Sequence, residues 1–163
     1  MTELRHHVVM GVAGCGKTTV GEALAATLGV PFADADDFHS AAARASMAAG
    51  IPLVDSDRWP WLDRLVAWLD EHADTGGVLA CSALRRGYRD RLRTASRPVG
   101  FAELDVAPDV LRDRMTQRVG HYMPVALLES QLATLEPLQA DEGIRLDGTL
   151  PVPDLVTAIL GAR

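Results

Sequence analysis

Short apolar runs alternate with segments that carry apolar residues at helical spacing along the whole chain. Residues 7–12 are the clearest run of the first kind, and runs of this type form strands buried on both faces of a sheet. Residues 58–73 are the clearest segment of the second kind. The pattern predicts strands over 7–12, 30–35, 78–81, 99–104 and 143–146, and helices over 17–28, 40–49, 58–73, 88–94, 108–118, 124–135 and 153–160.

Strands that are separated by helices predict an α/β fold with a parallel sheet and right-handed crossovers. In such sheets, ligands bind at the carboxyl ends of the strands. The chain has 163 residues and contains no internal repeat or linker rich in Pro, Gly or Ser. Since a domain commonly holds roughly 100 to 150 residues, the sequence predicts one domain over 1–163.

Charge and composition narrow the possible partners. Sixteen Lys and Arg residues stand against 22 Asp and Glu, which gives a net charge of −6 and argues against a nucleic-acid-binding surface. No segment approaches the roughly 20 apolar residues that span a bilayer, and the first residues lack a signal-peptide pattern. We therefore expect a cytoplasmic protein with neither nucleic acid nor membrane as a partner.

Cysteine and lysine usage is unusual. Cys15 and Cys81 form no CxxC motif, which argues against a zinc site or a disulfide framework and favours buried thiols in a reducing compartment. Fifteen of the sixteen basic residues are Arg, and Lys17 is the single Lys. Keeping one Lys indicates a position where the forked guanidinium cannot replace a compact ammonium.

That lysine lies in a glycine-rich motif between a predicted strand and a predicted helix. The motif GxxxxGK[ST] is formed by Gly11, Val12, Ala13, Gly14, Cys15, Gly16, Lys17 and Thr18. Its amides and the helix N-terminus favour a polyphosphate. Lys17 is predicted to bridge the β- and γ-phosphates of ATP, the Thr18 hydroxyl to bind Mg²⁺, and Thr19 to add a phosphate contact.

This phosphate-binding loop (P-loop) does not by itself name a reaction. A GTPase switch is disfavoured, because GTPases normally read guanine with an Asn-Lys-x-Asp motif and this chain has no Asn. A second acid near the magnesium could be Asp105, at the end of strand 99–104, or Asp34, which follows the P-loop helix and is paired with Asp36. The residues alone leave both acids open.

Further segments resemble a known family. The P-loop, with Asp34, Asp36 and His39, is similar to the shikimate-kinase-like small-metabolite kinases, and longer blocks resemble the bacterial gluconate kinases. These blocks are 47–53, 55–62, 81–90, 118–122 and 131–136. The departures from the usual pattern are Cys15 for Ser, Arg85 in a position that often holds Lys, and Tyr122 for Phe.

The resemblance implies a three-layer P-loop kinase fold, with a parallel five-stranded sheet of order 2-3-1-4-5 and a small lid at about 118–124. It implies transfer of the γ-phosphoryl group of ATP to the 6-hydroxyl of D-gluconate, with Mg²⁺, in a homodimer. Another small-metabolite or nucleoside monophosphate kinase of this fold is the alternative. A non-catalytic nucleotide-binding protein is a further one.

The same analogy assigns roles to the acids and to the acceptor site. Asp34 is expected to hold Mg²⁺ through water, and Asp36 to act as base or positioner for the attacking hydroxyl. Because gluconate is an anion rich in hydroxyls, its site is expected to offer Arg and hydrogen-bonding groups. The candidates are Arg58, His39, Ser82 and Arg85, with Arg89 in reserve.

Each acceptor-site candidate also has an ordinary structural interpretation. Arg58 could be a solvated residue at a helix start, although a cation there opposes the helix dipole. His39 could cap or satisfy a polar group of the core. For Trp59 and Trp61, core packing is the favoured interpretation, ahead of shaping the substrate pocket.

Three residues are candidates for the nucleotide side. Arg114 and Arg118 are spaced by four and therefore share one helix face. They resemble the lid edge of nucleoside monophosphate kinases, where the first Arg packs on adenine and the second reaches the phosphates. Arg118 is thus expected to be catalytic together with Lys17 and Asp36, unless both arginines are solvated. Leu150 lies in a turn similar to the adenine loop of adenylate kinases, although such turns are common.

Overall fold

The apolar runs of the sequence form one central parallel sheet. In the computed structural model, which describes residues 5–117 and 125–162, its strands follow the spatial order β2-β3-β1-β4-β5, and every neighbouring pair is parallel. The predicted strand order is therefore confirmed. The strands are β1 (His6–Met10), β2 (Phe32–Asp34), β3 (Val78–Ala80), β4 (Val99–Asp105) and β5 (Gly143–Asp147).

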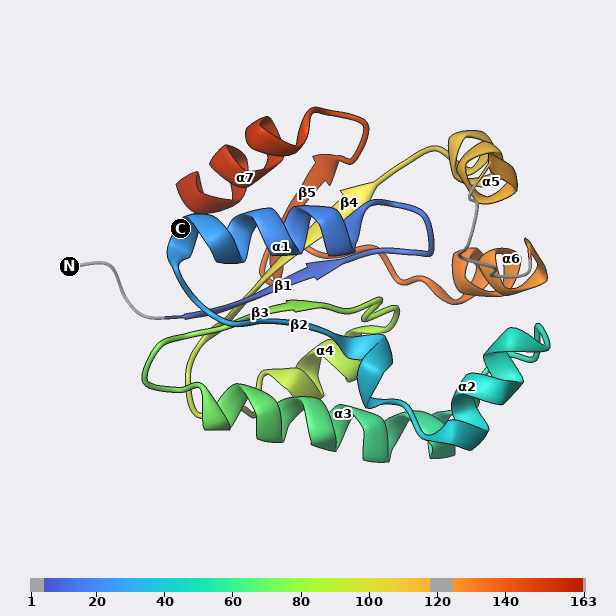
Figure 1. Ribbon diagram of the computed structural model, residues 1–163, viewed down its shortest axis with the longest axis horizontal. Helices are drawn as coiled ribbons and strands as arrows, with labels where there is room; N and C mark the ends of the chain where they lie inside the picture. The colour runs from blue at the N-terminus through green and yellow to red at the C-terminus, as the bar shows by residue number, and fades with distance from the viewer. Residues whose placement is uncertain (1–4, 118–124, 163) are drawn as a thin grey trace.

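Helices cover both faces of this sheet, which confirms the three layers (Figure 1). α1 (Lys17–Leu28) and α7 (Val152–Gly161) lie on one face, and α3 (Asp55–Glu71) and α4 (Arg86–Leu92) lie on the other. β1 supplies both cores by strand alternation, since Val9 packs with the first helix pair while Val8 and Met10 pack with the second.

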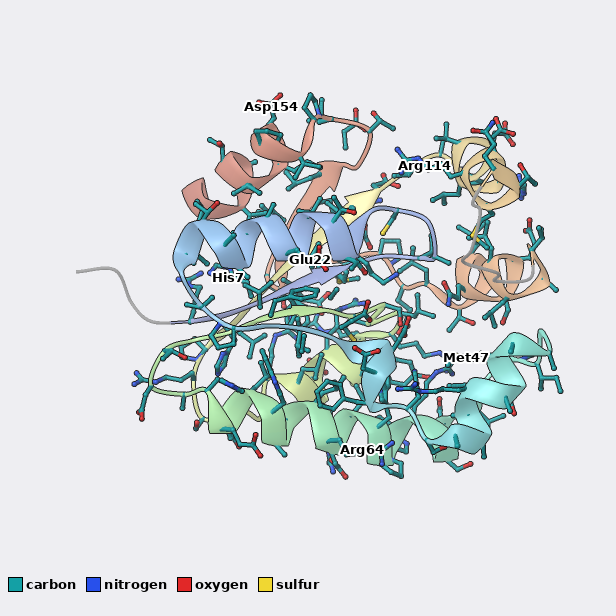
Figure 2. All side chains as sticks on the ribbon, in the orientation of Figure 1. His7, Glu22, Met47, Arg64, Arg114 and Asp154 are labelled. Carbon is teal, nitrogen blue, oxygen red and sulfur yellow. The ribbon has the colours of Figure 1, made fainter. Side chains whose placement is uncertain are left out.

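Three further helices lie at the carboxyl edge of the sheet, outside the layers (Figure 1). They are α2 (Ala41–Ala48), α5 (Pro108–Gln117) and α6 (Val125–Thr134). Figure 2 shows Met47 on α2 and Arg114 on α5 at this edge, with His7 toward the opposite end of the sheet. The expected lid, 118–124, lies outside the described residues. None of the helices within residues 5–117 and 125–162 combines the length and the apolar character of a membrane span.

The element boundaries differ from prediction by two residues or fewer, with one exception. The helix expected at residue 58 begins at Asp55, because the Asp57 carboxylate accepts a hydrogen bond from the Val54 amide at 3.1 Å and caps the first turn.

Two strand ends were also predicted too long. β1 stops at Met10, before Gly11 turns the chain into the P-loop with φ of 145°. β2 stops at Asp34, where the 3₁₀ turn η1 (Ala35–Phe38) begins. Asp34 and Asp36 therefore do not share one strand face.

Candidate functional site

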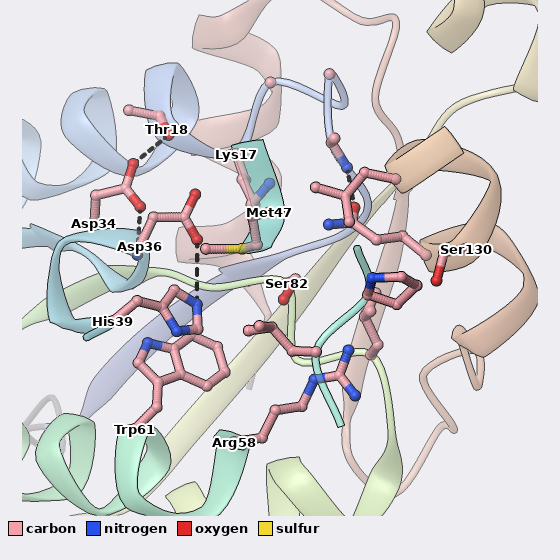
Figure 3. A pocket seen from close by; sticks show the side chains of 18 of the residues that line it. Lys17, Thr18, Asp34, Asp36, His39, Met47, Arg58, Trp61, Ser82 and Ser130 are labelled. Atoms are coloured by element: carbon pink, nitrogen blue, oxygen red, sulfur yellow. Dashed lines mark hydrogen bonds and ion pairs between the residues drawn. The ribbon is translucent and has the colours of Figure 1, made fainter. Parts of the chain in front are cut away.

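A cavity of about 390 Å³ opens at the carboxyl edge of the sheet (Figure 3). One wall is the P-loop and the start of α1. The opposite wall comes from η1, α2, α3 and the loop after β3, and α6 borders both. The predicted site residues on its lining are Ala13, Gly14, Gly16, Lys17, Thr18, Thr19, Asp34, Asp36, His39, Arg58 and Ser82.

The P-loop has the backbone that a phosphate cradle requires. Gly14 and Gly16 have φ of 82° and 97°, a conformation that side chains with a Cβ rarely adopt. Gly16 immediately precedes α1, whose first residue is Lys17, so the helix N-terminus and the lysine face the same cavity. The side chains of Val12 and Cys15, which belong to the loop, are buried in the core. Cys15 and Cys81 are both buried free thiols, as predicted.

A hydroxyl and a carboxylate meet beside the cradle. The Thr18 hydroxyl donates to Asp34 Oδ2 at 3.0 Å. These are hard oxygen donors of the type that Mg²⁺ prefers, so the residues present fit the ion. The other candidate acid, Asp105, instead accepts a hydrogen bond from Arg145 at 3.1 Å. The structure therefore favours Asp34 over Asp105.

Asp34 also fixes its neighbour Asp36. Asp34 Oδ1 accepts a hydrogen bond from the Asp36 amide at 3.0 Å, which caps η1 and turns the Asp36 side chain into the cavity. The Asp36 side chain is 56% exposed, but its surroundings are concave. This partial burial raises the pKa of Asp36, against the opposing charge of Lys17. Two adjacent carboxylates thus have different environments.

His39 lies next to Asp36 on a rigid support. Its ring stacks on Trp61 with centroids 4.3 Å apart, and its Nε2 lies 3.9 Å from Asp36 Oδ1. Burial and the positive charges of nearby arginines lower the pKa of His39 to about 4, so the ring is neutral at pH 7. Its Nδ1 is buried and finds no hydrogen-bond partner among the described residues. His39 therefore has an unused polar atom.

Three side chains from neighbouring helices hold η1 in place. Trp61 Nε1 donates to the Ala35 carbonyl at 2.7 Å, Arg64 Nε to Phe38 at 2.8 Å, and one Arg44 Nη to Asp37 at 2.7 Å. Trp61 is buried in the core and also lines the cavity, so the packing and pocket interpretations both hold for it. Trp59 is absent from the lining.

Arg58 enters the cavity from the first turns of α3, and Figure 3 shows its guanidinium directed toward the centre. Its side chain is only 15% exposed, so it is not the solvated residue of the alternative interpretation. One Nη donates to the Tyr88 hydroxyl at 3.1 Å. Tyr88 in turn donates to Asp55.

Ser82 lies in a constrained loop between β3 and α4. The next residue, Ala83, has φ of 45°, and its carbonyl accepts a hydrogen bond from the buried Arg89 at 2.8 Å. The same Arg89 nitrogen, Nη1, also donates to the Glu136 carbonyl at 3.1 Å, and Nε and Nη2 pair with the Glu142 carboxylate at 2.7 and 3.0 Å. Arg89 is therefore a scaffold residue and not a reserve ligand.

Arg85 lies just before α4 and is exposed. It does not belong to the cavity lining, so the structure does not bring it together with the other acceptor-site candidates.

The sequence interpretation missed the contribution of α6. Gln131 Oε1 accepts a hydrogen bond from the Ala13 amide of the P-loop at 2.8 Å, and Ser130 and Leu127 also line the cavity. Gln131 belongs to the block 131–136 that carried the resemblance, but nothing local in that block indicated a partner 118 residues away. Apolar lining from Met47, Pro52 and Leu53 was missed as well.

Two of the nucleotide-side candidates, Arg114 and Leu150, do not belong to the lining of this cavity. One Arg114 Nη donates to the Gly14 carbonyl at 3.0 Å, so this arginine supports the P-loop from α5. Leu150 is exposed in the turn after β5, and a shallow hollow of about 440 Å³ lies at the ends of β4 and β5. Arg118 lies outside the described residues.

Comparisons with known proteins agree with this geometry. The sequence profile of the shikimate kinase family matches residues 13–120. The gluconokinase of Gluconobacter oxydans (strain 621H) is 48% identical over 155 residues, which cover 93% of this chain and 86% of that protein.

Two solved structures are also similar. A sugar kinase from Janibacter sp. HTCC2649 has a TM-score of 0.91 and 49% identity, covering 96% of this chain and 92% of that one. A gluconokinase from Sinorhizobium meliloti 1021 has a TM-score of 0.88 and 40% identity, covering 99% and 93% of the two chains.

Proposed function

Because the chain belongs to the shikimate kinase family and to the gluconokinases within it, we propose that it transfers the γ-phosphoryl group of ATP to the 6-hydroxyl of D-gluconate, giving 6-phospho-D-gluconate. One observation carries the proposal. A single cavity holds a phosphate cradle on one wall and an acid, a neutral histidine and an arginine on the other.

The P-loop wall receives the phosphate groups. Its amides and Lys17 offset charge on the β- and γ-phosphates, which is the main need of a loose phosphoryl-transfer transition state. Thr18 and Asp34 would hold Mg²⁺, which when bound supplies further neutralisation of that charge. Thr19 adds a phosphate contact from the same turn.

Asp36 is the acceptor-side base. Its partial burial raises its pKa, so its carboxylate is a stronger base than an ordinary Asp and suits a hydroxyl proton. The hydrogen bond between its own amide and Asp34 fixes its position along the wall. We assign it the proton of the 6-hydroxyl.

The remaining acceptor groups match an anionic polyol. Arg58 offers guanidinium N–H groups to the carboxylate, and the Ser82 hydroxyl and the free His39 Nδ1 offer hydrogen bonds to the chain hydroxyls. Arg85 is left out of this assignment because it lies outside the lining.

We place the adenine near Arg114, Leu150 and the hollow at the ends of β4 and β5, with Arg118 reaching the phosphates. The resemblance and the position of Arg114 against the P-loop support this placement. The resemblance also supports a cytoplasmic location and a homodimer. Light scattering on the purified protein would test the dimer.

An acceptor screen tests the function. The enzyme, ATP and Mg²⁺ are incubated separately with gluconate, shikimate, nucleoside monophosphates and other sugar acids, and products are identified by mass and phosphorus NMR. We expect gluconate to give the highest kcat/KM and a 6-phosphate. Preference for another acceptor would reject the substrate, and nucleotide binding without any turnover would reject the enzyme.

A further inference from the structure

Tyr88 stands between the pocket arginine and an acid. Its hydroxyl accepts a hydrogen bond from Arg58 Nη1 at 3.1 Å and donates its own proton to Asp55. Burial and the bond to Asp55 raise the pKa of Tyr88, which keeps the phenol protonated and able to donate at neutral pH. One hydroxyl thus satisfies a cation and an anion at once.

Without the hydroxyl, the loose ion pair of Arg58 and Asp55 would be free to close into a direct hydrogen bond. Arg58 Nη1 and Asp55 Oδ1 are 3.9 Å apart, beyond hydrogen-bond length, with the phenol oxygen bonded to both. Both residues lie on the first turns of α3, spaced by three, which is the spacing of a helical ion pair. A direct contact would turn the guanidinium toward Asp55 and away from the cavity.

The surrounding packing holds the phenol ring in this position. Tyr88 is buried on α4, its ring meets Trp59 edge to face with centroids 5.7 Å apart, and the Arg58 guanidinium carbon lies 5.4 Å from the ring centroid. These contacts involve the ring and not the hydroxyl. Replacing Tyr88 by Phe would therefore keep the packing and remove only the bridging oxygen.

We propose that Tyr88 is a positioning residue for acceptor specificity: its hydroxyl keeps Arg58 from a direct hydrogen bond with Asp55 and so presents the guanidinium to the carboxylate of a sugar-acid substrate. The inference rests on the proposed function, in which Arg58 binds that carboxylate. The other guanidinium nitrogens of Arg58 make no hydrogen bond within residues 5–117 and 125–162, so they remain available for a ligand.

The test uses steady-state kinetics of the full chain carrying Tyr88→Phe, alone and with Asp55→Asn. Tyr88→Phe should raise the KM for gluconate about 5- to 20-fold, as expected for a weakened hydrogen bond to a charged group, and change the KM for ATP and kcat less than about twofold. Adding Asp55→Asn removes the competing charge and should restore most of the gluconate KM. Asp63→Asn, on the same helix but paired with Arg91, is the matched control and should restore nothing.

Arg58→Ala distinguishes the carboxylate-binding role of Arg58 from the positioning role of Tyr88. If Arg58→Ala leaves the gluconate KM unchanged, the carboxylate-binding role fails, and the inference fails with it. If Arg58→Ala raises that KM but Tyr88→Phe does not, only the positioning role is overturned. An equal rise in both KM values for Tyr88→Phe, or no rescue by Asp55→Asn, would also overturn it.

Discussion

The two walls of the cavity are built in different ways. The phosphate wall is mostly backbone from one short segment, Gly11 to Thr18, shaped by glycines with positive φ. The acceptor wall is made of side chains from η1, α2, α3 and the loop after β3, and hydrogen bonds from neighbouring residues hold Asp36, Arg58 and the loop of Ser82. Backbone can bind phosphate in any kinase of this fold, whereas in the proposed function the side chains select the acceptor.

This difference predicts that damage to the phosphate wall impairs turnover or the use of ATP, and that damage to the acceptor wall, apart from the proposed base Asp36, weakens the binding of the acceptor. Variants of residues on each wall test this difference.

The largest effect is expected at Lys17. Lys17→Ala should lower kcat by a factor of 10³ or more, roughly the range attributed to groups that stabilise charge in phosphoryl transfer, with an unchanged unfolding temperature. Lys17→Arg should not rescue it, because the planar fork is larger than the ammonium that the cradle admits. Near-normal turnover of Lys17→Arg would contradict the prediction that a guanidinium cannot replace the ammonium at this position.

The next test concerns the two acids. Asp36→Asn should lower kcat about 10²- to 10⁴-fold at every Mg²⁺ concentration while ATP binding persists, since a base has been removed. Asp34→Asn should recover partly as Mg²⁺ is raised, because the Asn oxygen can still accept the hydrogen bond of the Asp36 amide and the proposed metal contact is weakened but not lost. Mg²⁺ titrations of turnover and of ATP binding measure both, and the opposite pattern would exchange the two roles.

Arg58→Ala should act through substrate binding. The KM for gluconate is expected to rise about 10- to 100-fold, because a charge-assisted contact to the carboxylate is lost in ground and transition states alike. The KM for ATP should change little. Arg91→Ala is the matched control, since Arg91 is an exposed arginine paired with Asp63. An equal rise in the KM for gluconate and the KM for ATP would contradict the assignment of Arg58 to the acceptor carboxylate.

Gln131→Ala should have a smaller effect, and that effect should fall on the KM for ATP instead of the KM for gluconate. Loss of its hydrogen bond to the Ala13 amide should loosen the P-loop and change the KM for ATP about 3- to 10-fold, with the gluconate KM unchanged. Gln139→Ala, at an exposed amide bonded to the Pro137 carbonyl, is the control. A change confined to gluconate would place Gln131 with the acceptor.

The smallest effect is expected in the pH dependence of stability. The pKa of His39 is about 4 in the folded protein against an ordinary 6.5, so its neutral form is favoured by folding. This contribution is complete above pH 6.5 and is lost as the pH falls toward 4. His39→Gln should therefore show a shallower fall of Tm between pH 7 and 4.5 than the unmodified chain. If Tm falls equally with pH in His39→Gln and in the unmodified chain, His39 is not buried as a neutral ring.

The same contrast explains what the sequence could predict. The P-loop, α1 and the strand order follow from local patterns and from the resemblance, and the structure agrees with them. Gln131 could not be found, because its partner lies 118 residues away. Arg85 and Arg89 belong to one block, and only tertiary packing decides that the first is exposed and the second buried.

Arg89 also limits how the acceptor loop can be re-engineered. Its guanidinium bonds to the Ala83 carbonyl, the Glu136 carbonyl and the Glu142 carboxylate, so the loop after β3 and the connection from α6 to β5 share one anchor. Breaking a buried pair by removing one partner typically costs about 3–5 kcal/mol. When the loop after β3 is exchanged between relatives to change the acceptor, Arg89 and Glu142 must therefore be transferred together. The two residues are expected to co-vary in sequence although they lie 53 residues apart.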